Sequence, residues 1–177
     1  PAGANSSGTS GAGYWVVAAT GRSAAQGVAP VLGSAKVAGA DTEVVDVTPT
    51  PDGAGYWQLT ADGEVWAFGS ADTFGSLGRA RLGTPAVGIV ATATGAGYWL
   101  ATADGGVHPF GDARAVGTLG REVLRSPVVD VERSADGQGL WLLQADGSIR
   151  ALGAAGSYGA PRDRSARARA RAAAAEM

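Results

Sequence analysis

The sequence predicts an all-β fold in which four tandem units of about 42 residues are arranged like the blades of a β-propeller. An aromatic pair recurs at one fixed spacing, a Gly-x-Gly segment precedes each copy, and another Gly follows six residues after each Trp. The pair occurs at Tyr14-Trp15, Tyr56-Trp57 and Tyr98-Trp99, and as Leu140-Trp141 in the fourth unit. Glycine supplies 29 of 177 residues, which fits a chain with many tight turns.

Each unit is expected to form four short strands. In the second unit the first strand covers Tyr56 to Ala61, and Asp62-Gly63 predicts a type I′ hairpin turn with positive φ at both central residues. The return strand covers Glu64 to Gly69, and a weaker third strand covers Asp72 to Leu77. The copies of the fourth, valine-rich strand are Glu43 to Val47, Pro85 to Thr92 and Pro127 to Glu132.

The two ends depart from the repeat. The first unit has Thr20-Gly21 in place of Asp-Gly, and an Ala/Arg-rich segment of high helix propensity replaces the last valine-rich strand. We therefore expect a flexible N-terminal linker (residues 1–10), a four-unit repeat domain (11–160) and an Ala/Arg-rich tail (161–177). Three arrangements remain open: a small four-bladed ring, half of a ring closed by a second copy, or part of a longer array.

The amino-acid composition limits the kinds of functional site that the chain can form. The chain has no Cys and a single His, which excludes thiol chemistry and disfavours a tetrahedral zinc site. The net charge is −2 with an acidic repeat region, so no nucleic-acid partner is expected. No apolar run is long enough to span a bilayer. The small, polar opening is typical of a linker, or of a mature N-terminus from which a signal peptide has been removed, so we expect a secreted protein without a cofactor.

The unit Gly-x-Gly-Tyr-Trp, followed by Asp-Gly-x-Val-x-x-Phe-Gly, resembles a tandem repeat of secreted actinobacterial proteins, and its second part is similar to the repeat of RCC1-like β-propellers. Residues Gly53 to Val90 and Gly95 to Val131 carry the resemblance best. It implies a propeller fold, export from the cell, and a role as a recognition or spacer module beside cell-wall or polysaccharide hydrolases. It implies no reaction.

The repeated polar residues are interpreted as structural. Asp62-Gly63, Asp104-Gly105 and Asp146-Gly147 share one column. The three carboxylates could be calcium ligands or paired glycosidase carboxylates, but Asp before Gly is what a hairpin turn requires, so we expect turn residues. His108 shows no oriented partner in the sequence, so no catalytic or metal-binding residue is predicted and the protein is expected not to be an enzyme.

The aromatic columns are the candidates for binding. On alternating strand faces one column of each pair points into a sheet interface and the other away from it. The Trp column is expected to form the repeat core: Trp15, Trp57, Trp99 and Trp141. The candidate ligand-binding patch consists of the Tyr column and one variable position: Tyr14, Tyr56, Tyr98, Trp66 and His108.

Three functions are consistent with these observations. The first is a non-enzymatic extracellular recognition or scaffold module that binds cell-wall polysaccharide or a protein partner. The second is a structural subunit of a larger assembly whose repeats are completed by another chain, because unpaired edge strands invite partners. The third is an accessory domain of a cell-wall or polysaccharide hydrolase.

Overall fold

The structure is a computed structural model and describes residues 13–35, 42–78, 82–119 and 124–157. These residues form eleven strands in four antiparallel sheets, one of two strands and three of three. We call the sheets blades 1 to 4. Blade 1 contains β1 (Gly13–Val17) and β2 (Ser23–Gly27); blade 2 contains β3 (Val44–Pro49), β4 (Gly55–Thr60) and β5 (Val65–Gly69); blade 3 contains β6 (Ala86–Ala91), β7 (Gly97–Thr102) and β8 (Val107–Gly111); blade 4 contains β9 (Val128–Arg133), β10 (Gly139–Gln144) and β11 (Ile149–Gly153).

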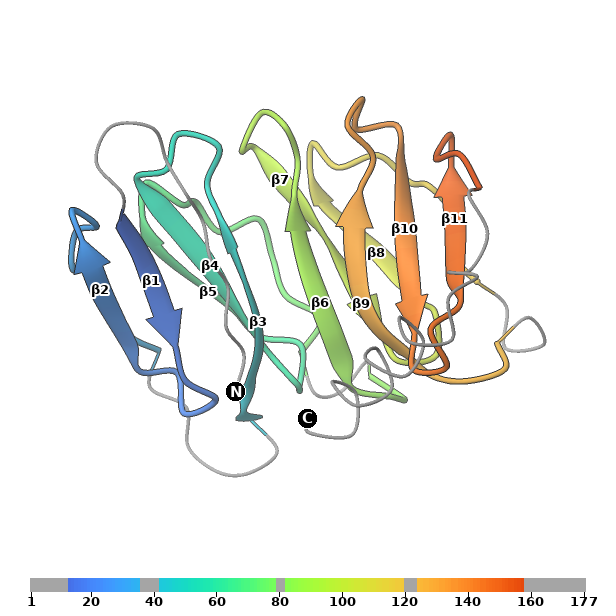
Figure 1. Ribbon diagram of the computed structural model, residues 1–177, viewed down its shortest axis with the longest axis horizontal. Helices are drawn as coiled ribbons and strands as arrows, with labels where there is room; N and C mark the ends of the chain where they lie inside the picture. The colour runs from blue at the N-terminus through green and yellow to red at the C-terminus, as the bar shows by residue number, and fades with distance from the viewer. Residues whose placement is uncertain (1–12, 36–41, 79–81, 120–123, 158–177) are drawn as a thin grey trace.

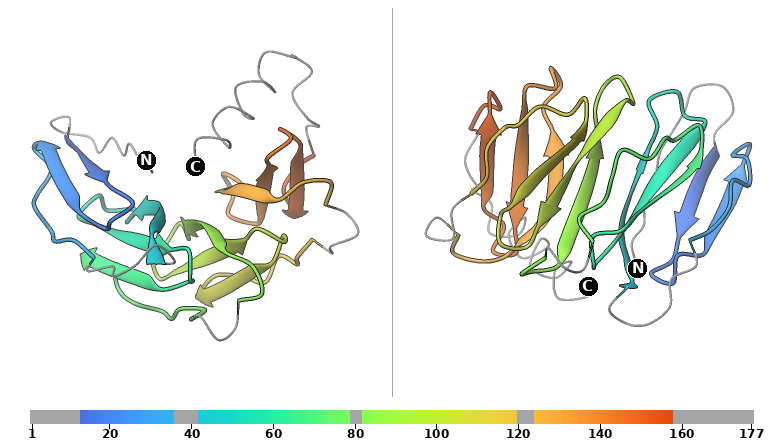
Figure 2. Two further views of the ribbon diagram at one scale, coloured as in Figure 1. Left: turned by 90° about the horizontal axis from the view of Figure 1, so that it is seen from below. Right: turned by 180° about the vertical axis from the view of Figure 1, so that it is seen from behind.

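The blades stand side by side in chain order, each packed face to face against the next (Figure 1). Seen from below, they follow an open arc, with β3, β6 and β9 on its concave side (Figure 2, left). Consecutive inner strands contact one another, β3 with β6 and β6 with β9. The fold is therefore all-β and propeller-like with four blade units, as the repeat predicts. Among the described residues no helix is long and apolar enough to cross a membrane.

The number of strands in a unit differs from the prediction. The valine-rich strand pairs with the Tyr-Trp strand of the following unit, as β3 does with β4, so it begins a blade instead of ending one. The expected third strand, Asp72 to Leu77, is not a strand. Its backbone is bonded outside any ladder: the Asp72 carbonyl accepts the Trp57 indole N–H at 2.7 Å, and the Leu77 N–H donates to the Gly63 carbonyl at 3.0 Å.

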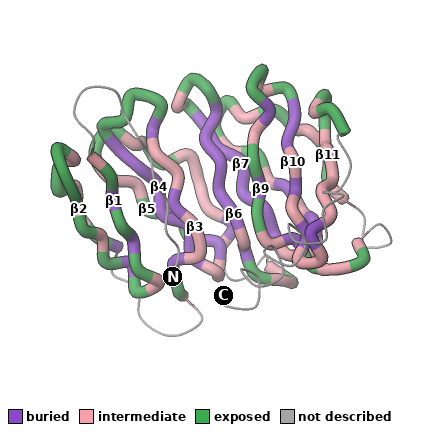
Figure 3. The backbone as a smooth tube through the Cα atoms, viewed as in Figure 1, coloured by how far each residue is buried: buried purple, intermediate pink, exposed green. Residues whose placement is uncertain are grey.

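Both faces of the middle strands are covered. All six residues of β4 and all six of β7 are buried, because each of these strands has a neighbouring blade on either side (Figure 3). The Trp column lies in the core at Trp15, Trp57 and Trp99, as expected. The expectation that the Tyr column is exposed is wrong at Tyr56 and Tyr98, which are 1% and 0% exposed. A strand alternates between core and solvent only where one face of its sheet is open.

The Asp-Gly turns hold the hairpins but are not of the predicted type. In blade 2, Gly63 N–H donates to the Thr60 carbonyl and Thr60 N–H to the Glu64 carbonyl, so the loop contains three residues. Such loops need a positive φ only at their last position, where Gly63 has a φ of 83°. Asp62 accepts the Thr60 hydroxyl at 2.5 Å, which fits a structural role for this carboxylate.

One buried amide stands out in this core. Gln58 on β4 is 0% exposed, and neither polar atom of its side chain has a hydrogen-bond partner. It lies near the Tyr56 hydroxyl but makes no hydrogen bond of good geometry with it; burial raises the pKa of that phenol, and Ser23 and then the nearby Gln58 oppose the rise. The same repeat position holds Leu100 in blade 3 and Leu142 in blade 4, both fully buried.

We expect the substitution Gln58→Leu to stabilise the chain. It removes two unsatisfied polar atoms at nearly constant volume, so the free energy of unfolding should rise by about 1–3 kcal/mol. Urea unfolding measures this change, and Leu100→Gln is the matched control that should destabilise blade 3. A loss of stability in Gln58→Leu would show that the amide is satisfied.

Candidate functional site

The same kind of side-chain contact recurs at each junction between neighbouring blades. We call the face that carries the Trp column the trailing face of a blade, and the opposite face, which carries the Tyr column, its leading face. Trp15 of blade 1 meets Tyr56 of blade 2 with ring centroids 5.2 Å apart, and Trp57 of blade 2 meets Tyr98 of blade 3 at 5.7 Å. Trp99 of blade 3 packs in one cluster with Leu140 of blade 4. Each internal junction therefore pairs a trailing face with the next leading face.

Hydrogen bonds fix the register of these junctions. The Tyr56 hydroxyl donates to the Gly33 carbonyl at 2.8 Å, and the Tyr98 hydroxyl donates to the Gly75 carbonyl at 2.6 Å. A Cβ at Gly75 would lie 2.8 Å from the Phe110 ring, so only glycine lets the loop approach this closely. In every blade the Trp indole N–H donates to a carbonyl fifteen residues further along the chain.

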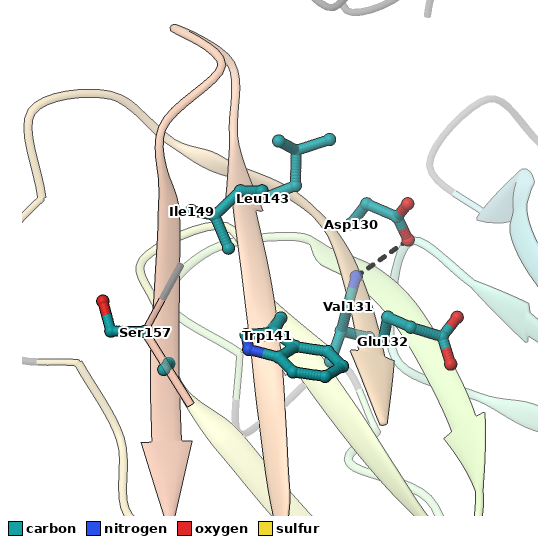
Figure 4. Close-up of a pocket in the computed structure, with 8 residues that line it drawn as sticks. Asp130, Val131, Glu132, Trp141, Leu143, Ile149 and Ser157 are labelled. Carbon is teal, nitrogen blue, oxygen red and sulfur yellow. Dashed lines mark hydrogen bonds between the residues drawn. The ribbon is translucent and has the colours of Figure 1, made fainter. Parts of the chain in front are cut away.

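Among the described residues, no further sheet packs on the trailing face of blade 4. Its apolar side chains, Trp141 and Leu143 on β10 and Ile149 on β11, are all partly exposed. The corresponding residues of blade 2, Trp57, Leu59 and Val65, are at most 8% exposed. The side chains of blade 4 surround a hollow of about 300 Å³. Figure 4 shows them projecting from adjacent strands around it.

Acidic residues border the hollow on the inner strand. Asp130 and Glu132 lie on β9, next to Leu143 and Trp141 in the sheet register, and both are exposed. The surface thus has an apolar part on β10 and β11 and an acidic part on β9. An apolar hollow with charged residues at one edge is a surface suited to binding another molecule.

The leading face of blade 1 is the second open junction surface. Tyr14 and Val16 on β1 are 42% and 46% exposed. Their neighbours across the hairpin, Gln26 and Ala24 on β2, are exposed as well. Equivalent positions in blade 3 hold Tyr98 and Leu100, both 0% exposed.

A carboxyl joins blades 2 and 3 at the level of the inner strands. Asp46 on β3 accepts the Val47 N–H at 2.7 Å and, across the junction, the Ile89 N–H at 2.8 Å. Burial raises the pKa of Asp46 to about 7, although both N–H groups oppose the rise. Asp130 occupies the same repeat position in blade 4 and accepts the Val131 N–H at 2.8 Å. At the open face of blade 4, Asp130 therefore accepts the N–H of the next residue in its own strand, as Asp46 does in blade 2.

The structure does not assemble the predicted aromatic patch. Tyr56 and Tyr98 are buried between blades and cannot receive a ligand. Trp66 is 40% exposed on β5 and His108 is partly exposed on β8, each on the outer strand of its own blade. Tyr14 lies on the leading face of blade 1, at one end of the arc. The five residues therefore form no common surface.

The turn carboxylates keep a structural role. Asp104 accepts the Thr102 hydroxyl at 2.7 Å, and Asp146 accepts the Ser148 hydroxyl at 2.5 Å, as Asp62 does with Thr60. In the described ranges no group of three His, Asp or Glu side chains is placed to hold a metal ion.

Sequence reasoning missed the open face of blade 4. It assigned Trp141 to the core with the other Trp residues and did not single out Leu143 or Ile149. The repeat itself carries no signal for this exposure, because Trp141 stands in the same column as Trp15, Trp57 and Trp99.

No protein-family model matches the sequence, and no curated protein matches it. Many solved structures are similar in fold, among them the following two. Sqt1 of Chaetomium thermophilum, bound to the N-terminus of ribosomal protein L10, is 16% identical with a TM-score of 0.56, over 78% of this chain and 42% of that one. The Cps50 (Swd1) β-propeller domain of Myceliophteria thermophila is 11% identical with a TM-score of 0.55, over 85% of this chain and 51% of that one.

These comparisons place the chain among proteins of β-propeller fold. The chain spans about half the length of the two structures it matches. Four blades on an open arc are thus comparable to part of a propeller, with a junction face exposed at each end.

The Asp46 carboxyl predicts a pH dependence of stability. Folded Asp46 holds its proton up to a pH of about 7, whereas the unfolded chain releases it near 3.8, so its contribution to stability falls as the pH rises between these values. Relative to Asp46→Asn, the wild-type chain should lose on the order of 2 kcal/mol over this interval; partial exposure of the carboxyl keeps the loss below that of a fully buried group. Urea unfolding at a series of pH values measures the difference, and a constant difference would contradict the assignment.

Proposed function

We propose that the chain is a non-enzymatic protein-interaction module and that its binding surface is the trailing face of blade 4. The observation that carries this proposal is the exposure of Trp141, Leu143 and Ile149 around a hollow, at repeat positions that another sheet covers in blades 2 and 3. An apolar sheet face with a hollow lined by a Trp fits the surface of another folded protein, since aromatic anchors in closely packed pockets dominate such interfaces.

The similar structures support a protein partner. Sqt1 is bound to the N-terminus of ribosomal protein L10 in its structure, and Cps50 (Swd1) is described as a β-propeller domain. The repeated carboxylates of this chain serve its turns, as the bonds from Thr60 to Asp62 and from Thr102 to Asp104 indicate. A role as a scaffold is therefore the function that fold and surface favour together.

Fewer aromatic residues are exposed for polysaccharide binding than the sequence predicts. With Tyr56 and Tyr98 buried, the exposed Trp66 is the remaining aromatic platform on β5, and His108 is its partly exposed counterpart on β8. Trp66 and the exposed Tyr14 lie on different blades, and rings that share no surface are a weak basis for binding a sugar chain. We therefore place the protein partner ahead of cell-wall polysaccharide; the expectation of an extracellular site of action rests on the sequence resemblance.

A photo-crosslinking side chain at position 143 tests the proposed surface. We expect it to attach covalently to a defined protein partner, because Leu143 lies on the trailing face beside the hollow. The matched control carries the same group at position 31, where Val31 is 87% exposed and lies outside this face. The companion substitution Ile149→Glu should abolish the crosslink from position 143.

Retention on cell-wall polysaccharide is measured in parallel for the wild-type chain and Trp66→Ala. Equal crosslinking from positions 143 and 31, together with retention that is lost in Trp66→Ala, would overturn the protein-binding proposal in favour of the polysaccharide.

A further inference from the structure

The junction between blades 2 and 3 shows how the trailing face of a blade holds the strand that covers it. There β6 of blade 3 lies beside β3 of blade 2, and the Ile89 N–H on β6 donates to one carboxyl oxygen of Asp46 at 2.8 Å. The other oxygen of Asp46 accepts the Val47 N–H of its own strand at 2.7 Å. The Ile89 side chain is 3% exposed and packs in one cluster with Leu59 and Val65. A single carboxyl thus fixes the strand that lies on this apolar face.

The trailing face of blade 4 carries the same groups at the same repeat positions, two units further along the chain: Asp130, Leu143 and Ile149. Asp130 accepts the Val131 N–H with one oxygen at 2.8 Å (Figure 4), and within the described part of the chain its other oxygen makes no hydrogen bond. Leu143 and Ile149 are partly exposed beside it. Asp130 therefore offers an acceptor at the point where the covering strand bonds in blade 2.

One position differs between the two faces, and it concerns charge. Glu132 on β9 replaces Thr48 of blade 2 and projects on the same side of the strand as Asp130, because side chains two residues apart share a face. Desolvation raises the pKa of Asp130 against the bond from Val131, and the negative charge of Glu132 raises it further. None of the described residues that line the hollow is basic. A cation supplied by a partner would offset the repulsion between the two carboxylates.

We propose that the trailing face of blade 4 binds an extended strand of a partner protein that carries an Arg or Lys beside an apolar residue. The apolar side chain packs on Leu143 and Ile149, and the N–H of the same residue donates to Asp130. The basic side chain pairs with Glu132. This inference rests on the proposed function and names the chemistry of its partner. In such recognition the main-chain bonds hold the strand and the side-chain contacts select its sequence.

Charge complementarity favours a basic strand over the inner strands of this chain. A neutral strand would take water from Glu132 without supplying a counter-charge, and such burial is costly. At this repeat position blades 2 and 3 have the uncharged Thr48 and Val90, so the strands that cover them need no cation. None of the described inner strands β3, β6 and β9 has a net positive charge. A second copy of the chain therefore fits this face less well than a basic partner strand.

Peptides that copy residues 85–92 test the proposal with the full chain, because these residues include Ile89 and cover the matching face of blade 2. Three versions carry Arg, Gln or Glu at both ends. We expect the Arg version to bind roughly tenfold more tightly than the Gln version, and the Glu version to bind most weakly. Fluorescence anisotropy measures the affinities. A photo-crosslinking side chain at position 143 should attach to the Arg peptide, whereas the same group at the exposed position 31 should not.

Methylation of one peptide nitrogen isolates the backbone bond. The Arg peptide methylated at the residue that copies Ile89 lacks that N–H and should bind the wild-type chain roughly tenfold more weakly. In Asp130→Ala the methylated and unmethylated peptides should bind alike, and in Glu132→Gln the Arg and Gln peptides should bind alike. Glu64→Gln removes an exposed carboxylate from the turn between β4 and β5 and is the matched control that keeps both differences. Circular dichroism confirms that every variant is folded.

The outcomes separate this inference from the proposed function. Peptides that do not bind, that bind equally whatever their end charges, or that keep the methyl effect in Asp130→Ala overturn the inference. If position 143 nevertheless crosslinks to a partner protein, the proposed function stands. A crosslink from position 143 to residues 158–177 of the same chain, or to a second copy, reveals a different occupant and overturns the inference. If no peptide binds and position 143 crosslinks to nothing, both proposals fail.

Discussion

The contact between the Trp of one blade and the leading face of the next is the interaction on which the rest of the structure depends. A sheet of two or three strands cannot bury enough apolar surface alone, so each blade is stabilised by its neighbours. Trp57 and Tyr98 show this in the middle of the chain, where both are fully buried and their rings meet edge to face. Truncation of a buried Trp costs about 3–5 kcal/mol, which is comparable to much of the stability of a small domain.

Because each blade depends on its neighbours, the outer faces of the first and last blades expose apolar side chains. A blade buries its trailing face only if another sheet packs on it, and blade 4 has Trp141, Leu143 and Ile149 at that position without one among the described residues. In blade 1 it is the leading face that is open, and Tyr14 and Val16 on it are exposed. The candidate site therefore follows from the repeat, because its apolar side chains occupy the positions that form the junctions between blades 1 to 4.

The sequence predicts much of this architecture because the period places equivalent side chains at equivalent sites. It predicts the four units, the buried positions of Trp15, Trp57 and Trp99, and the turn role of Asp62. It fails for Tyr56 and Tyr98, since alternation along a strand indicates an open face only when one side of the sheet meets solvent. It also fails for Asp72 to Leu77, whose backbone bonds to the Trp57 indole and to a turn instead of a ladder. Exposure at blade 4 depends on whether another sheet packs against the unit, and the residues of the unit itself do not encode this.

The environment of Trp141 tests most directly whether the trailing face of blade 4 is open for binding. Fluorine NMR of the chain labelled with fluorotryptophan reports on its five Trp residues, and the Trp141 resonance is assigned with Trp141→Phe. With a soluble paramagnetic probe, we predict that the Trp141 resonance broadens, as that of the exposed Trp66 does, while the resonances of the buried Trp15, Trp57 and Trp99 keep their width. A Trp141 resonance as protected from the probe as that of Trp57 would contradict an open face at blade 4.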